Sequence, residues 1–121
     1  MSSDKDKVAE WFELLNGCGK PIIVEGVKDR DSLRSCGISN DIFLLKKPIY
    51  AVVEEVASKA TDVVVLTDLD RTGKQLYGKL FSDLQHRGVR IDNFFREFLF
   101  RNTKIRQIEG LHRYFQNLHS P

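Results

Sequence analysis

The amino-acid sequence predicts one α/β domain with a mainly parallel four-stranded sheet and helices on both of its faces. Short apolar runs, which are typical of buried parallel strands, alternate with segments whose apolar residues recur at helical spacing. This alternation implies right-handed crossovers between parallel strands. The length of 121 residues fits a single domain, and 41% hydrophobic and 30% charged residues are ordinary for a globular protein.

The first part of the chain predicts two helices and two strands. Residues 3–16 carry apolar side chains at helical spacing, and Gly17 is a natural stop for this helix. The run 21–25 (PIIVE) is almost continuously apolar and predicts a buried strand. A short helix is expected at residues 29–36, and a second strand at residues 41–45 (DIFLL).

The second part repeats this alternation and ends in helices. Pro48, which is favoured in a first helical turn, opens a helix with isoleucine and valines on one face. Residues 61–67 (TDVVVLT) give the strongest strand signal, and a helix follows them. Residues 89–92 predict a short fourth strand. The tail 93–119 reads as two helical segments around Asn102, beside a domain core expected at about residues 20–92.

Charge is unevenly distributed along the chain. The net charge is +2; residues 1–85 hold 12 basic and 14 acidic side chains, whereas residues 86–121 hold 7 and 3. A basic tail beside an acidic pocket suits a polyanion that touches the tail and brings its phosphates to bound metal. A solvated helix rich in arginine is the simpler explanation of the same excess, because basic patches are common.

The sequence gives no sign of a membrane segment. Its longest apolar runs, such as residues 63–66, are far shorter than the ~18–20 residues that span a bilayer, and the polar N-terminus lacks a signal-peptide pattern. We therefore expect a cytoplasmic protein without a membrane partner. Cys18 and Cys36 belong to no metal-binding or disulfide pattern, and both are expected to be reduced.

Three acidic residues follow predicted strands. Glu25 and Asp68 each end an apolar run, at the sheet edge where parallel α/β proteins bind ligands. Asp68 and Asp70 are two positions apart, which in extended chain places both carboxylates on one side, about 6.5 Å apart. One divalent cation, or a pair ~4 Å apart, fits between such groups and relieves their mutual repulsion.

Helix capping is the alternative explanation for each acid taken alone. Asp70 stands where it can cap the helix from Thr72, and Asp29 can cap the helix that it begins. Capping gives no reason for Asp68, Asp70 and a strand-terminal Glu25 to occur together.

Two segments resemble the signature motifs of the Toprim domain. They are PIIVEGVKDRDSL and, some forty residues later, VVVLTDLDRTGKQL. The domain is shared by type IA and type II topoisomerases, bacterial-type primases, OLD-family nucleases and small ribosomal-RNA maturation nucleases. The resemblance covers about residues 21–92 and is strongest to short stand-alone Toprim proteins typical of archaea and to the maturation nucleases. The stretch IEGL at residues 108–111 is similar to theirs, less specifically.

The resemblance implies roles for individual residues. Glu25 matches the glutamate that acts as general acid/base or metal ligand, and Asp68 and Asp70 match the aspartates that bind Mg²⁺, with Mn²⁺ as an alternative. Gly26 and Gly73 match motif glycines, whose missing side chains let backbone or phosphate approach closely. The implied activity is magnesium-dependent processing of RNA or DNA, with hydrolysis of a phosphodiester by metal-activated water.

Other charged residues near the motifs are candidate contacts of the substrate. Asp29 falls where nuclease-like members have a further acid and is a candidate auxiliary ligand. Lys28, Arg71 and Lys74 are placed to contact phosphate, unless they are solvated or paired with local acids. Four tail arginines are candidate contacts of the nucleic-acid backbone: Arg96, Arg101, Arg106 and Arg113.

Three other readings compete with a nuclease. Residues 68–72 spell DxDxT, the nucleophile motif of haloacid-dehalogenase-type phosphatases, but the downstream acidic pair of those enzymes is missing and the Glu25-Gly26 strand would go unexplained. A topoisomerase needs a tyrosine nucleophile, and the tyrosines here lie in helix-like segments where packing explains them. A non-catalytic module that docks RNA, DNA or a larger primase-like or topoisomerase-like machine remains open.

Overall fold

The computed structural model describes residues 4–118 and confirms the predicted α/β fold with a four-stranded parallel sheet. The strand order is β2-β1-β3-β4, and all three neighbouring pairs are parallel. The strands are short: β1 (Ile22–Val24), β2 (Ile42–Leu44), β3 (Asp62–Val65) and β4 (Arg90–Asp92). Residues 3 and 119, at the outer ends of the predicted terminal helices, lie outside the described residues.

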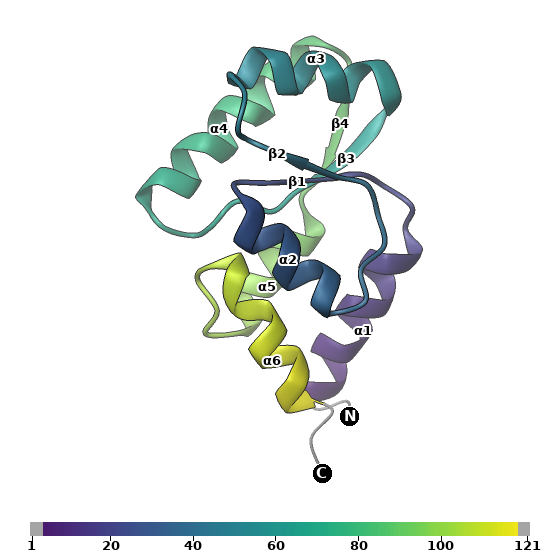
Figure 1. Ribbon diagram of the computed structural model, residues 1–121, viewed down its shortest axis with the longest axis vertical. Helices are drawn as coiled ribbons and strands as arrows, with labels where there is room; N and C mark the ends of the chain where they lie inside the picture. The colour runs from purple at the N-terminus through teal and green to yellow at the C-terminus, as the bar shows by residue number, and fades with distance from the viewer. Residues whose placement is uncertain (1–3, 119–121) are drawn as a thin grey trace.

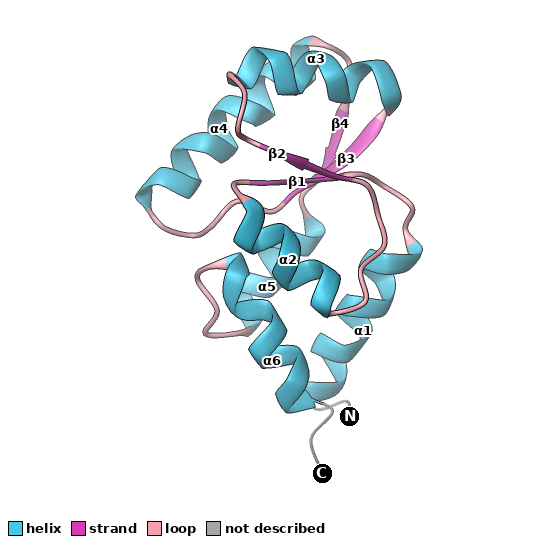
Figure 2. Ribbon diagram, viewed as in Figure 1, coloured by secondary structure: helices cyan, strands magenta, loops and turns pink. Residues whose placement is uncertain are grey.

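Helices cover both faces of the sheet, as Figures 1 and 2 show. Helices α3 and α4 lie on one face, and α2 lies on the other together with α1, α5 and α6. No helix of residues 4–118 is long and apolar enough to cross a membrane. The bounds are α1 (Asp4–Gly17), α2 (Val27–Ser35), α3 (Ile49–Lys59), α4 (Arg71–His86), α5 (Phe94–Asn102), the 3-10 turn η1 (Ile108–Gly110) and α6 (Leu111–Leu118).

Helices α2 and α3 begin at other positions than the sequence predicts, and α4 begins at Arg71, one residue before the predicted start. Helix α2 begins at Val27, two residues before Asp29, because the Asp29 carboxylate accepts a hydrogen bond from the Gly26 N–H and so caps the earlier start. Helix α3 begins after Pro48, which occupies the N-cap position with extended backbone.

The strands are buried on both faces, which explains their continuous apolar runs. Along β1, Ile22 and Val24 face the side of α1 and α2, whereas Ile23 faces α3 and α4. The valines of β3 alternate in the same way, and the register pairs Ile22 with Val64.

The segment after β4 is part of the core. We call residues 93–118 the tail. Its buried side chains pack against α1, α2 and the face of the sheet that these two helices cover. They are Phe95, Leu99, Phe100, Ile108 and Leu111. Trp11 of α1 also joins this cluster, and its indole N–H donates to the Phe95 carbonyl oxygen at 2.9 Å. The tail is therefore a wall of the domain rather than an appended arm.

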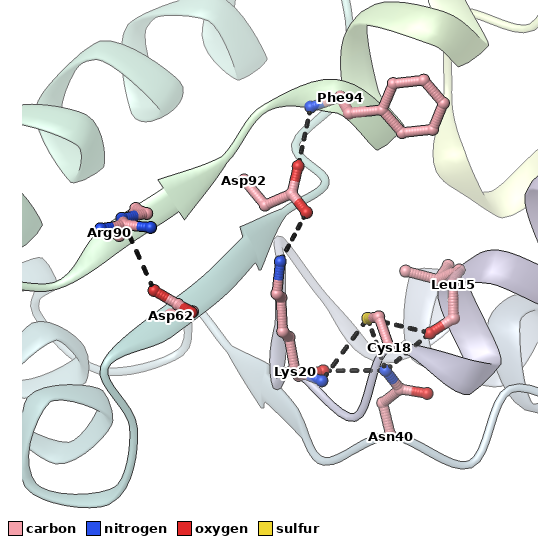
Figure 3. A network of polar contacts seen from close by, with 8 residues as sticks. All are labelled: Leu15, Cys18, Lys20, Asn40, Asp62, Arg90, Asp92 and Phe94. Carbon is pink, nitrogen blue, oxygen red and sulfur yellow. Dashed lines mark hydrogen bonds and ion pairs between the residues drawn. The ribbon is translucent and has the colours of Figure 1, made fainter.

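A polar network connects α1 and β4 with the residues before β1 and β2 (Figure 3). Lys20 Nζ lies 2.8 Å from Asp92 Oδ2, and the other Asp92 oxygen accepts from the Phe94 N–H at 3.1 Å. The buried Asn40 amide donates to the carbonyl oxygens of Leu15 and Lys20 at 3.0 and 2.8 Å. These bonds fix the turn through which α1 leads into β1.

The strand order places a switch point between β1 and β3. The chain leaves β1 through α2 on one face and leaves β3 through α4 on the other face. In such sheets a crevice opens beyond the carboxyl ends of the two central strands. A site is therefore expected where Glu25 and Asp68 follow β1 and β3.

We predict that Trp11→Phe destabilises the fold by about 1–3 kcal/mol, because it leaves the Phe95 carbonyl without its buried partner. Tyr50→Phe is the matched control: Tyr50 is 69% exposed, so loss of its hydroxyl changes stability by less than about 0.5 kcal/mol. Urea denaturation followed by circular dichroism measures both. Equal stabilities of the two variants would contradict the importance of this contact.

Candidate functional site

The structure brings Glu25 and Asp68 together at the carboxyl edge of the sheet. Glu25 follows β1 directly, and Asp68 lies three residues beyond the end of the neighbouring β3. Glu25 Oε2 accepts a hydrogen bond from the Asp68 N–H at 2.7 Å. A side chain from one central strand thus holds the backbone that leaves the other.

Residues of the tail also form hydrogen bonds with the loop that joins β3 to α4. Asp68 Oδ1 accepts from the Ile108 N–H at 2.8 Å, and the Leu69 N–H donates to the Arg106 carbonyl oxygen at 2.8 Å. Ile108 is fully buried. The IEGL stretch therefore contributes directly to the position of Asp68.

Arg96 has a structural role that the sequence did not reveal. Its Nε and Nη2 atoms donate to the carbonyl oxygens of Thr67 and Asp68 at 3.0 and 2.9 Å. The guanidinium lies over the rings of Tyr77 and Phe100, 4.5 and 5.2 Å from their centroids. Burial lowers the pKa of Arg96. Two of its donor atoms thus hold the loop, and a contact of Arg96 with nucleic acid stays a prediction.

Asp70 and Asp29 act as helix caps. Asp70 Oδ1 accepts from the Gly73 N–H at 2.7 Å at the start of α4, and Asp29 Oδ2 accepts from the Gly26 N–H at 3.1 Å at the start of α2. One oxygen of each carboxylate therefore caps a helix, as the alternative explanation predicts. Two helix N-termini, both favourable to anions, begin at this edge of the sheet.

Gly73 permits a close approach of α4 to the loop. A Cβ atom at this position would overlap the carbonyl group of Asp68. The Thr67 hydroxyl donates to the Gly73 carbonyl oxygen at 2.8 Å and closes the same contact. At Gly26, by contrast, an added Cβ meets nothing within 4 Å, so a role of Gly26 in phosphate approach stays a prediction.

Three acidic side chains of this edge have a raised pKa. Burial is the largest cause of the raised pKa of Glu25, Asp68 and Asp29. Repulsion adds to it: Asp70 acts on Glu25 and Asp68, and Glu109 acts on Asp68 and Asp29. Sequence reasoning missed Glu109 as a member of this cluster, although it lies within the IEGL stretch that resembled known Toprim proteins.

The arrangement fits a cation that is bound by few protein ligands. Within residues 4–118, no three His, Cys, Asp or Glu side chains are grouped to hold a metal ion by themselves. Mg²⁺ commonly takes only one or two carboxylates and completes its shell with water and substrate phosphate. Glu25, Asp68 and Asp70 each engage one oxygen with a backbone N–H, which leaves the second oxygen of each for such a role.

The predicted phosphate contacts surround this edge. Lys28 is exposed on the first turn of α2, and Arg71 and Lys74 are exposed on the first turn of α4. None of the three has an ion pair or side-chain hydrogen bond within residues 4–118. Arg101 and Arg106 are exposed on the tail; Arg106 donates to the Thr103 and Ile105 carbonyl oxygens.

A cavity of about 920 Å³ adjoins the acidic cluster. It lies between α2, the loop from β3 to α4 and the tail, and Asp70 and Glu109 stand in its wall. The cavity therefore shares residues with the candidate site.

Curated relatives cover most of the chain. It is 38% identical to a UPF0292 protein of Methanocaldococcus jannaschii, over 78% of this chain and 77% of that protein. It is 40% identical to a UPF0292 protein of Pyrococcus abyssi, over 75% and 70%. With a UPF0292 protein of Thermococcus sibiricus the identity is 33%, over 93% of each chain.

A solved structure shares the fold. A protein from Aquifex aeolicus superimposes with a TM-score of 0.78 and 30% sequence identity, covering 85% of this chain and 96% of that one. No protein-family model matches the sequence.

We predict that Gly73→Ala destabilises the protein by about 3 kcal/mol, because the new methyl group must displace the Asp68 backbone. Gly78→Ala in the same helix is the control. An added Cβ there meets nothing within 4 Å, so helix propensity should stabilise the protein by about 0.5–1 kcal/mol. Thermal unfolding measures both, and the same sign for the two variants would contradict the close approach.

We also predict that Asp68→Asn stabilises the protein near pH 7 when divalent cations are absent. The asparagine oxygen can still accept from the Ile108 N–H, whereas the buried, repelled charge is removed. A carboxyl whose pKa is raised by folding costs stability above its unfolded pKa and nothing well below it. The gain in melting temperature should therefore vanish as the pH falls below ~3.9. A gain independent of pH would contradict this explanation.

Proposed function

The chain belongs to the UPF0292 family, and from this premise we propose that it is a Toprim-type enzyme that hydrolyses nucleic-acid phosphodiesters with Mg²⁺. The observation that carries the proposal is the Glu25–Asp68 contact at the switch point of the sheet. It unites the two halves of the Toprim-like sequence pattern at the edge where parallel sheets bind ligands.

The acidic residues of this edge have different roles in the proposed reaction. Asp68 and Asp70 would hold the cation through the oxygens that do not accept from Ile108 or Gly73. A bound divalent cation supplies charge neutralisation of the phosphodiester and activation of water. Glu25 would accept the proton of the attacking water on its free oxygen. Burial raises the pKa of Glu25, and a general base works best when its pKa is near the pH of the reaction.

Positive charges favour a polyanionic substrate. Lys28, Arg71 and Lys74 are exposed beside the acids and have no described acidic partner, so their ammonium and guanidinium groups can meet flanking phosphates. Helices α2 and α4 both begin at this edge, and the positive end of a helix dipole favours an anion. A substrate with several phosphates uses these contacts better than a small phosphomonoester.

We predict that the protein cleaves structured RNA or DNA with Mg²⁺ or Mn²⁺ and that chelator abolishes cleavage. Glu25→Gln, Asp68→Asn and Asp70→Asn should each lower the rate by at least about a hundredfold. Gel analysis of labelled RNA and DNA measures this, with Lys79→Ala as an exposed control outside the site. Equal rates in all variants would contradict the catalytic proposal. Hydrolysis of only a small phosphomonoester would favour the DxDxT phosphatase.

We further predict that Mg²⁺ raises the melting temperature of the wild type. Ligands that bind only the folded state stabilise it in proportion to the logarithm of their concentration. The increase should be lost in Asp68→Asn, although that variant starts from a higher melting temperature without cation. Glu13→Gln, at an exposed acid of α1, is the control and should respond as the wild type does. The same Mg²⁺ response in Asp68→Asn would contradict cation binding by Asp68.

A further inference from the structure

The cavity beside the acidic cluster has the size of a small-molecule site. Its volume of about 920 Å³ lies within the ~300–1,000 Å³ that such sites commonly have. Asp70 belongs both to its wall and to the candidate catalytic edge. A group that fills the cavity therefore lies next to the phosphate that would be hydrolysed.

The wall of the cavity carries three basic and three acidic side chains. Lys28, Arg106 and Arg113 contribute positive side chains, and within residues 4–118 Lys28 and Arg113 form no ion pair. The acids in the wall are Asp31, which is paired with Arg30 at 3.3 Å, Asp70, which caps α4, and Glu109. Two basic groups are thus available to an anion that enters from the catalytic edge.

The remaining wall suits the flat, partly polar surface of a nucleobase. Leu69 and Ile105 are half-buried and packed against the core, so they offer a firm apolar surface. The Gln107 amide, which can both donate and accept hydrogen bonds, is exposed on the same wall. Leu69 is held in place, because its N–H donates to the Arg106 carbonyl oxygen.

Resting on the proposed function, we propose that this cavity receives one unpaired nucleotide next to the scissile phosphate. The substrate is then a single-stranded end or loop rather than an uninterrupted duplex. Bases inside a duplex are stacked and paired, and their faces cannot reach an apolar wall, whereas unpaired bases can be turned outward into a pocket. The tail supplies Ile105, Arg106 and Gln107 to the cavity, and the two Toprim-like segments supply Lys28 and Leu69.

A binding experiment separates the proposal from catalysis. Fluorescence anisotropy compares a labelled hairpin with a blunt end and the same hairpin with a short single-stranded overhang, with Ca²⁺ in place of Mg²⁺. The wild type should bind the overhang at least about tenfold more tightly. Lys28→Ala/Arg113→Ala should remove this preference and lower the log–log salt slope by about one for each phosphate that the protein no longer neutralises. Lys79→Ala/Arg87→Ala, which removes the same charge from the exposed surface of α4 and its C-cap, should bind as the wild type does.

A second variant tests whether the overhang preference needs the open volume of the cavity. Gly110 lines the cavity, and an added Cβ there meets nothing within 4 Å, so Gly110→Phe should fold and partly fill the cavity. We expect it to lose the overhang preference while it retains binding to the blunt hairpin. A free mononucleotide should compete weakly with the overhang on the wild type.

The outcomes are distinguishable. Equal binding of blunt and overhang hairpins, or an overhang preference unchanged in both cavity variants, would overturn the cavity proposal even if cleavage is observed. A mononucleotide that binds as tightly as the overhang would also overturn it, in favour of a site for free nucleotides. An overhang preference without cleavage would support the cavity and refute only the proposed hydrolysis.

Discussion

The site depends on how the backbone of residues 67–69 satisfies its polar groups. This segment leaves β3 without continuing the sheet, so its buried N–H and C=O groups need partners from elsewhere. Glu25 accepts from the Asp68 N–H, and Arg96 donates to the Thr67 and Asp68 carbonyl oxygens. The Leu69 N–H donates to the Arg106 carbonyl oxygen. Partners from β1 and the tail therefore determine where the carboxylates lie.

These partners also explain why acids can be crowded at this edge. Each carboxylate receives a backbone N–H, which favours its charged form, while burial and the neighbouring acids oppose that form more strongly for Glu25 and Asp68. The folded state thus retains unfavourable charge that a cation would relieve. The same charge that lowers the stability of the folded protein would favour the binding of a cation at this edge.

The sequence predicted the elements well because their signals are local. Apolar runs and helical spacing identified all four strands, and the strand-terminal positions of Glu25 and Asp68 follow from the rule for parallel sheets. Helix capping by Asp70 was also foreseeable from its position before α4. The contacts of Arg96 and Ile108 were not foreseeable, since they join residues 28 to 40 positions apart through tertiary packing.

The tail links the core, the acidic loop and the cavity. Its apolar side chains complete the core that α1 and α2 begin, and its backbone meets the loop at Ile108 and Arg106. The same stretch then forms one wall of the cavity. A substitution there changes two properties together, because the position of Asp68 and the shape of the space beside it share the same supports. The proposed recognition of a nucleotide and the placement of the acids would in this way depend on one packing arrangement.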